Sequence, residues 1–153
     1  MRLTTFSDYS MRMLIYLAAA PHQRATIAEV ARAYGVSEHH MVKVVHLLGK
    51  AGFLKNTRGK GGGVELALPA SEINVGRVMR FTEGEDMPAE CFDRARNSCR
   101  ISGACRLQRA LHEAVESFYR VLDRYTLESL TANRSKVRVL LRLQPVAEPR
   151  TLN

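Results

Sequence analysis

The sequence predicts a mainly α-helical fold with one small β-hairpin. Three observations support this fold class: two helices joined by a glycine turn between residues 26 and 52, a period-two strand at 64–68, and apolar residues three or four apart from 104 to 130. The chain of 153 residues can form one core of ordinary size, or a small domain with an oligomerising helix. This order of elements is that of a winged helix-turn-helix domain followed by a long dimerisation helix.

The first two elements are helices with recognisable starts. Ser7 can cap a helix that runs to about Ala20. Thr26 and Glu29 have the spacing of a capping box, which predicts a second, short helix that ends at Tyr34. The apolar stretch of the first helix is too short to span a bilayer, and no basic run opens the chain. We therefore expect a core helix in a cytosolic protein.

A glycine turn and a third helix complete the helix-turn-helix pattern. Gly35 tolerates the backbone of a tight turn, and Ser37 can cap the helix that follows and ends near Gly52. Four apolar residues of this helix fall at i, i+3, i+4 and i+7 and predict one buried face: Met41, Val44, Val45 and Leu48. The histidines and lysines between them are expected on the opposite face.

A β-hairpin with a basic tip is predicted next. Segments 53–57 and 64–68 flank the glycine-rich sequence Arg58-Gly59-Lys60-Gly61-Gly62-Gly63. The tip is not a nucleotide cradle, because the pattern G-x-x-x-x-G-K-[ST] is absent and no helix follows directly. A slim cationic wing is the expected structure, and a flexible loop is the alternative.

The second half of the chain is predicted to hold a loop and a long helix. Asn74 can cap a short helix through Phe81, and a helix from about Ala104 to Leu130 would be roughly 40 Å long. Its apolar stripe needs a partner, most simply a second copy of the chain. We expect a DNA-binding domain at 1–81, a cysteine-bearing loop at 82–104, a dimerisation helix and a C-terminal helix at 105–143, and a flexible tail at 144–153.

The charge distribution favours a polyanionic partner. The formal net charge is +8, and residues 1–80 carry 11 basic and 5 acidic side chains against 12 and 10 in the remainder. Lys and Arg displace condensed counterions from phosphates, so a basic N-terminal half is typical of nucleic-acid binding. No compact acid–base or nucleophile–base motif is present, and an enzyme is not expected.

Double-stranded DNA is expected to contact two parts of the first domain. The N-terminal turns of the third helix present side chains to base edges in the major groove: Ser37, His39, His40 and Lys43. Thr26 and nearby amides can bind phosphate, and Arg58 and Lys60 at the wing tip suit a narrow minor groove. An ordinary solvated helix face is the alternative for the histidines.

Three cysteines lie within one stretch of 15 residues: Cys91, Cys99 and Cys105. An odd number in one cluster indicates a metal or redox site rather than a disulfide framework. Cys105 lies near the start of the long helix, where the dipole favours the thiolate that binds iron–sulfur clusters or zinc. Neither spacing is the C-x2-C of a zinc ribbon, and three free thiols are the alternative. His112 is one candidate for a fourth ligand, although a surface or interface role is commoner.

Four segments resemble the IscR/NsrR family of winged-helix regulators: Leu3 to Ser10, His40 to Lys43, Arg58 to Gly63, and Ala104 to Leu107. The resemblance covers nearly the whole chain and ends near Leu143. It implies a homodimer that carries an iron–sulfur cluster in each subunit and binds palindromic operators. IscR-like members use a histidine three residues after the third cysteine, and Gln108 stands there in this chain. That departure favours the nitric-oxide-sensing, NsrR-like branch.

The same resemblance implies a set of ligands. The family's three cysteine ligands match Cys91, Cys99 and Cys105, and the fourth ligand of NsrR-like members matches Asp8 from the other subunit. Without the resemblance, Asp8 is an ordinary first-turn carboxylate favoured by the helix dipole. Arg12, one turn later, can pair with Asp8 in the cluster-free form. Three thiolates and a carboxylate favour [4Fe-4S] over [2Fe-2S].

The resemblance thus implies a transcriptional repressor that senses nitric oxide. On this hypothesis the cluster bridges the dimer and sets the spacing of the two DNA-reading helices, and nitric oxide releases a ligand and then the DNA. Three alternatives remain: an iron- or redox-responsive regulator of the IscR-like type, a zinc or thiol sensor on the same fold, and an architectural protein without sequence preference.

Overall fold

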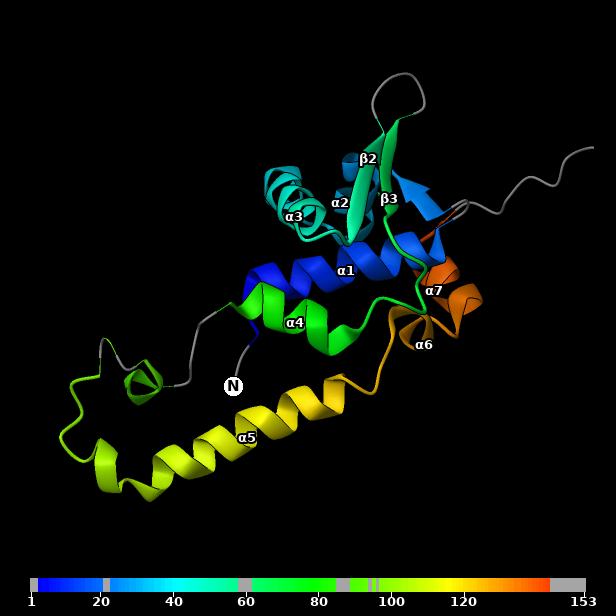
Figure 1. Cartoon of the computed structure of the whole chain (residues 1–153). Helices are drawn as coiled ribbons and strands as arrows, with labels where there is room; N and C mark the ends of the chain where they lie inside the picture. The colour runs from blue at the N-terminus through cyan, green and yellow to red at the C-terminus, as the bar shows by residue number, and fades with distance from the viewer. Residues whose placement is uncertain are drawn as a thin grey trace, which may run out of the picture.

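The computed structural model describes residues 3–20, 23–57, 62–84, 89–93, 95 and 97–143. Helices dominate it, and a three-stranded antiparallel sheet of order β1-β3-β2 lies beside them, so the predicted fold class is confirmed (Figure 1). The elements in chain order are α1 (Thr5–Ala19), β1 (Arg24–Ala25), α2 (Ile27–Tyr34), α3 (Glu38–Lys50), β2 (Leu54–Thr57), β3 (Gly63–Leu66), α4 (Val75–Glu83), the 3-10 turns η2 (Glu90–Phe92) and η3 (Ser102–Ala104), α5 (Arg106–Leu122), α6 (Leu127–Leu130) and α7 (Arg134–Leu140).

Helix α1 is the centre of the fold. Its apolar side chains Met13, Leu14 and Leu17 are fully buried, and α2, α3, α4, α6, α7 and β3 all pack against it. Arg138 of α7 donates a hydrogen bond to the carbonyl of Ala19 at 2.5 Å and satisfies one orphan acceptor at the end of α1. The C-terminal helices α6 and α7 are therefore part of the body that α1 organises.

The start of α1 differs from the prediction. The N-cap is Thr4, whose hydroxyl accepts a hydrogen bond from the amide of Ser7 at 3.1 Å. Ser7 lies three residues inside, is fully buried and donates to Thr82 of α4 at 2.8 Å. Thr4 and Ser7 are both good capping residues, and the sequence alone did not indicate that Ser7 was needed inside to meet α4.

The helix-turn-helix forms as the sequence predicts. Thr26 and Glu29 make both hydrogen bonds of the capping box at the start of α2. Gly35 ends α2 with φ 63°, a left-handed backbone that glycine adopts without a steric penalty. The four apolar residues that were predicted to form one face of α3 are all buried: Met41, Val44, Val45 and Leu48.

The hairpin is also present, with one strand that was not predicted. In β2 and β3, Leu54 pairs with Leu66 and Thr57 with Gly63, while Val64 of β3 pairs with Ala25 of β1. Strand β1 has only two residues and carries no alternating pattern that a sequence analysis can detect. The predicted tip residues Arg58 and Lys60 lie outside the described residues.

The predicted helix from 104 to 130 is two helices. Helix α5 ends at Leu122, so its 17 residues span about 25 Å rather than 40 Å. Thr126 then caps α6, and the carbonyl of Tyr125 accepts a hydrogen bond from the amide of Val75 at 3.0 Å. The apolar periodicity continues through the break because Leu127 enters the core, where its side chain is fully buried. Helix α5 extends away from the body toward the cysteine segment (Figure 1).

Candidate DNA interface and cysteine segment

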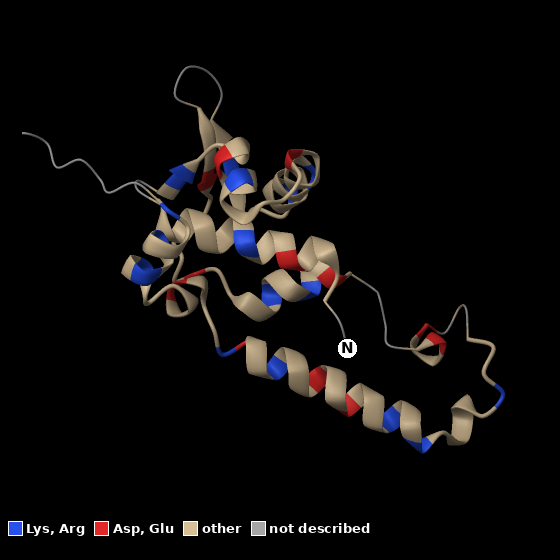
Figure 2. Ribbon diagram, turned by 180° about the vertical axis from the view of Figure 1, so that it is seen from behind, with Lys and Arg blue, Asp and Glu red and all other residues tan. Residues whose placement is uncertain are grey.

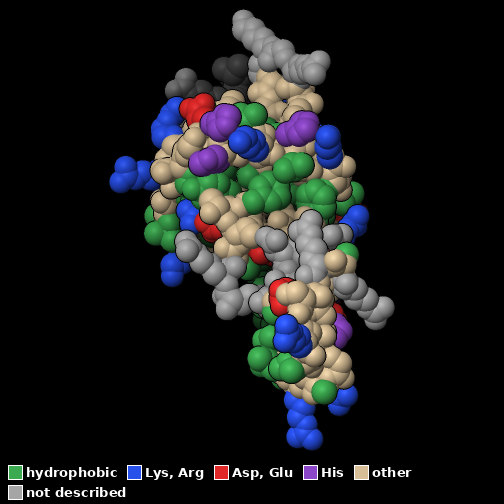
Figure 3. Space-filling view, turned by 90° about the vertical axis from the view of Figure 1, so that its left-hand side faces the viewer, with side chains coloured by type: hydrophobic (Ala, Val, Ile, Leu, Met, Phe, Trp, Pro, Cys, Tyr) green, Lys and Arg blue, Asp and Glu red, His purple; other side chains and the backbone are tan. Residues whose placement is uncertain are grey.

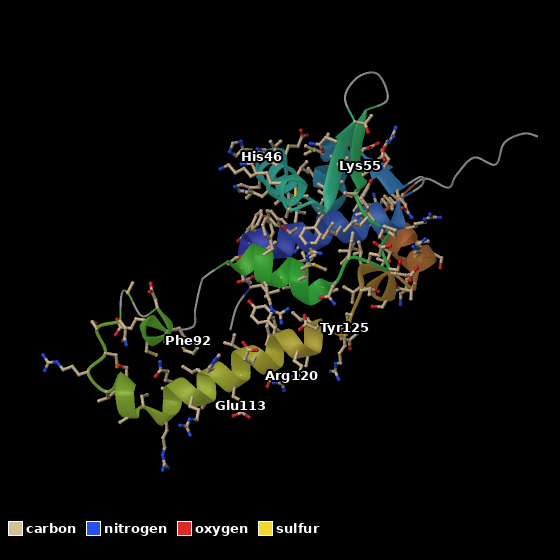
Figure 4. All side chains as sticks on the ribbon, viewed as in Figure 1. His46, Lys55, Phe92, Glu113, Arg120 and Tyr125 are labelled. Carbon is tan, nitrogen blue, oxygen red and sulfur yellow. The ribbon has the colours of Figure 1, made fainter. Side chains whose placement is uncertain are left out.

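Helix α3 is held with one face inward and one face free. Its buried residues pack toward α1, whereas the residues predicted to contact bases are all exposed: Ser37, His39, His40 and Lys43. Figure 3 shows histidine side chains gathered on one part of the surface, with Lys or Arg side chains beside them. His46, one turn further along α3, lies on the outer side as well (Figure 4). This exposed face has the shape and polarity of a helix that enters a major groove.

Of the predicted DNA contacts Ser37 and Thr26, only Thr26 is engaged in a local capping hydrogen bond. Ser37 occupies the N-cap of α3, but its side chain makes no capping hydrogen bond, so its hydroxyl is not committed to the helix. Thr26 is committed: its hydroxyl accepts from the amide of Glu29 at 3.2 Å and donates to the Glu29 carboxylate at 2.9 Å. A phosphate at the start of α2 would have to compete with that carboxylate.

At the root of the wing, two cations share one carboxylate. Arg24 on β1 and Lys55 on β2 both form ion pairs with Glu65 on β3. The hydrogen bond from Arg24, followed by that from Lys55, lowers the pKa of Glu65 below its ordinary value of 4.5. These ion pairs therefore link both outer strands to the central strand β3. The tip cations predicted to contact DNA, Arg58 and Lys60, are outside the described residues.

The three cysteines occupy three different turns of one segment. Cys91 lies in η2, Cys99 precedes η3, and Cys105 is the N-cap residue of α5. All three are free thiols and half-buried. Among the described residues, no three His, Cys, Asp or Glu side chains come together as a group able to hold a metal ion. The segment supplies suitable donors, and a single described chain does not close them into a site.

Asp8 lies in the first turn of α1 and pairs with Arg12. The two side chains are joined by an ion pair of 2.8 Å and a hydrogen bond of 3.0 Å, and each is about two-fifths exposed, at 43% and 39%. The guanidinium of Arg12 also lies over the rings of Tyr9 and Tyr34, at 5.8 and 5.6 Å from their centroids. The predicted pairing of Arg12 with Asp8 is thus the arrangement in this structure.

Two tyrosines near Arg12 were missed by the sequence analysis. Burial raises the pKa of Tyr34 to about 12, against the opposing effect of the Arg12 cation. The Tyr9 ring lies 6.1 Å from that of His40 on α3, so α1 and α3 meet through aromatic side chains. The spacing of Tyr9 and Arg12, three residues apart, is the one signal that predicts their contact on a helix.

Comparison with known proteins agrees with this architecture. Residues 3–133 match the family model of Rrf2, described as an iron-dependent transcriptional regulator. The chain belongs to the Rrf2 family. It is 41% identical to the HTH-type transcriptional regulator NsrR of Bacillus subtilis over 145 residues, which cover 94% of this chain and 99% of the relative. NsrR of Geobacillus kaustophilus is 43% identical over 143 residues, covering 93% and 97%.

Solved structures give the same result for the fold. The structure of CymR, the global cysteine regulator of B. subtilis, superposes with a TM-score of 0.66 at 27% identity, covering 87% of this chain and 98% of CymR. With these relatives, the resemblance to NsrR proteins is confirmed. The Rrf2-family chain is a DNA-binding transcriptional regulator and not an enzyme. Within the described part of the chain, no helix combines the length and apolarity needed to cross a membrane.

Proposed function

We propose that this Rrf2-family chain is a homodimeric repressor that binds a palindromic operator and senses nitric oxide through an iron–sulfur cluster. Cys91, Cys99 and Cys105 hold the cluster, and the partner subunit's Asp8 completes the ligand set. The similarity to NsrR proteins and the three thiols between α4 and α5 support this proposal. The donor set of three thiolates and one carboxylate favours [4Fe-4S] over [2Fe-2S].

The chemistry of the donors fits such a group. Thiolates are the usual ligands of iron–sulfur clusters, and Cys105 is a free, half-buried thiol at the N-cap of α5. When bound, the cluster supplies iron that reacts with nitric oxide. The fourth donor is assigned to Asp8 of the partner subunit on the resemblance to NsrR-like regulators, and within the described chain no three His, Cys, Asp or Glu side chains come together as a ligand group.

Exposed apolar side chains support the homodimer. Leu107 and Val121 of α5 are 64% and 44% exposed, and Val139 and Leu140 of α7 are 76% and 72% exposed. Helix α5 has no buried residue in the described chain although apolar side chains recur along it, and such an uncovered apolar face indicates a protein–protein surface. A second copy of the chain, packed against residues 105–143, would cover them and bring an Asp8 to the cysteine segment of its neighbour.

The contacts around Arg12 connect the proposed ligand Asp8 to the helix-turn-helix. Asp8 fixes the guanidinium between Tyr9, whose ring meets His40 on α3, and Tyr34, the last residue of α2. As a ligand, the Asp8 carboxylate would no longer pair with Arg12, and the guanidinium would be free to move against Tyr9 and Tyr34. Ligation and the orientation of the helix-turn-helix are thereby linked through one side chain. A coupling of about 3 kcal/mol would change operator affinity by about two orders of magnitude.

Anaerobic preparation followed by operator titration tests the proposal. We expect the wild-type chain to contain iron and sulfide, to bind the operator tightly, and to lose affinity on treatment with a nitric-oxide donor. Asp8→Asn should weaken the response while the cysteines still retain iron. Glu72→Gln, an exposed carboxylate outside α1, is the control and should behave as wild type.

Two outcomes would contradict it. A colourless protein without iron or sulfide after reconstitution would refute the cluster, and zinc in its place would favour the zinc sensor. An Asp8→Asn protein with the wild-type spectrum and nitric-oxide response would remove Asp8 from the ligand set.

A further inference from the structure

Gln108 makes a contact that the proposed ligand set does not use. Its side-chain amide nitrogen donates a hydrogen bond of 2.8 Å to the backbone carbonyl of Cys91, 17 positions earlier in the chain. Gln108 is half-buried and lies in the first turn of α5, three residues after Cys105. Residues three apart lie on neighbouring parts of a helix surface. The bond therefore ties the turn that carries Cys91 to the helix end that carries Cys105.

Two further contacts bind the same turn. The ring of Phe92, next to Cys91, meets His112 edge-on, with centroids 6.0 Å apart and planes at 89°. His112 is one helical turn beyond Gln108, so consecutive residues of η2 meet consecutive turns of α5. The hydroxyl of Ser98, next to Cys99, also donates to the Glu90 carboxylate at 3.2 Å. Each turn that carries a cysteine is therefore connected to another such turn by a side-chain hydrogen bond.

We propose that Gln108 is a positioning residue for metal binding: its amide fastens the Cys91 turn to α5 and holds the Cys91 and Cys105 segments together before a cluster binds. The inference rests on the proposed function. The neutral amide acts as a hydrogen-bond donor and not as a metal ligand. His112, committed to an aromatic contact with Phe92, supports the same turn.

The physical reason is the entropy of the cysteine segment. Cys91 and Cys105 stand 14 positions apart, and the described residues between them form only short turns. Ordering such a segment at the moment of metal binding would cost conformational entropy at many backbone angles. A side-chain hydrogen bond that closes the segment beforehand reduces that cost, as rigid support does for other metal sites. Glu90 and Ser98 are solvent-accessible, so the half-buried Gln108 bond should contribute most.

The test replaces Gln108 by leucine, which keeps the size and helix propensity of the side chain and removes the amide. Ala110→Leu is the matched control, since it adds the same side chain at an exposed position of α5. In the reduced, metal-free chain, each cysteine is alkylated with iodoacetamide and followed by mass spectrometry. We expect Cys91 to react about fivefold faster relative to Cys99 in Gln108→Leu, the factor that corresponds to about 1 kcal/mol for one hydrogen bond.

Spectroscopy then separates positioning from general stability. After anaerobic reconstitution, Gln108→Leu should show an altered visible circular dichroism spectrum and faster loss of iron to a chelator, with an unchanged midpoint of thermal unfolding. An unchanged Cys91 to Cys99 ratio, or an equal change in Ala110→Leu, would overturn the inference. If the wild-type chain takes up iron and sulfide and Gln108→Leu gives the same visible circular dichroism spectrum, the inference is also overturned. The proposed function would then stand. A wild-type chain that takes up no iron and sulfide would refute both.

Discussion

The junction between α4 and α5 yields the sharpest stability prediction. At Gly76 of α4, a Cβ atom would lie 2.0 Å from the Asp123 Oδ1 atom and 3.0 Å from the Asp123 backbone nitrogen. The Asp123 carboxylate receives two hydrogen bonds from Arg80, of 2.6 and 2.8 Å, and Arg80 lies over the Tyr119 ring. Gly76→Ala must therefore displace Asp123 and disturb the contact through which α5 meets the DNA-binding part of the fold.

The size of the effect follows from two opposing contributions. Overpacking a close contact costs about 1–3 kcal/mol, and replacing a helical glycine by alanine returns up to about 1 kcal/mol. We expect Gly76→Ala to lower the free energy of unfolding by about 1–2 kcal/mol. For a chain of this size that is a fall of roughly 2–8 °C in the midpoint of thermal unfolding. Differential scanning calorimetry at neutral pH is the direct measurement.

Gly49→Ala supplies the matched control. Gly49 also lies in a helix, but a Cβ atom at this position would meet only the carbonyl of Leu54 at 3.9 Å, an ordinary contact. The same substitution there should raise stability by up to about 1 kcal/mol. Equal shifts of the unfolding midpoint in Gly76→Ala and Gly49→Ala, or stabilisation by Gly76→Ala, would contradict the prediction. Either result would mean that Asp123 moves aside without a cost in stability.

The pH dependence provides a second check on the same junction. The hydrogen bonds from Arg80 lower the pKa of Asp123 below its ordinary value of 3.8. A carboxylate whose pKa is lowered in the folded state stabilises the fold at pH values above its ordinary pKa. This stabilisation is lost as the pH falls through the pKa of the folded state. The difference between Gly76→Ala and wild type should therefore shrink below about pH 4. A difference that stays constant in acid would assign the effect to packing alone.

Three further measurements test other parts of the structure. Leu127→Ala should lower the free energy of unfolding, measured by denaturant titration, by about 2–5 kcal/mol, because Leu127 is fully buried. A loss below about 1 kcal/mol would mean that α6 does not belong to the core. Lys43→Ala should reduce the slope of log affinity against log salt by about 1 if Lys43 contacts a phosphate, and an unchanged slope would exclude that contact. Glu65→Gln should lower the free energy of unfolding at neutral pH and lower it less below pH 4.5, because Arg24 lowers the pKa of Glu65. If wild type and Glu65→Gln differ in stability as much in acid as at neutral pH, the ion pairs of Glu65 are not the cause.

The helix-turn-helix was predictable because its signals are local. The capping box, the glycine with positive φ and the i, i+3, i+4, i+7 face of α3 each involve residues within one or two turns. The alternation in β3 is equally short-ranged. In such segments, local preference and tertiary structure agree, and the elements form where the pattern places them.

The elements that escaped prediction depend on distant partners. The break after Leu122 is stabilised by hydrogen bonds from Asn74 to the carbonyl of Asp123 and from Val75 to the carbonyl of Tyr125, about 50 positions away. Strand β1 exists because β3 offers it a pairing edge. The contact of Gln108 with Cys91 involves a side chain and a carbonyl, and no sequence pattern reports it.

The position of α5 decides how a change among the cysteines could reach α3. Its C-terminal end is fixed to α4 by the Arg80–Asp123 pair, and its N-terminal end carries Cys105 and the Gln108 contact. Seen from behind, α5 runs from the body of the fold out to the cysteine segment, with basic and acidic residues along its length (Figure 2). Under the proposed function, a change at the cysteines can reach α3 by two routes. In the first, α5 tilts about the Gly76 junction; in the second, Asp8 is released and Arg12 rearranges. Gly76→Ala disturbs the first and leaves Arg12 and its tyrosines in place. If that variant keeps the wild-type loss of operator affinity on nitric-oxide treatment, the signal travels through Asp8 and α1; if it loses the response, α5 transmits it.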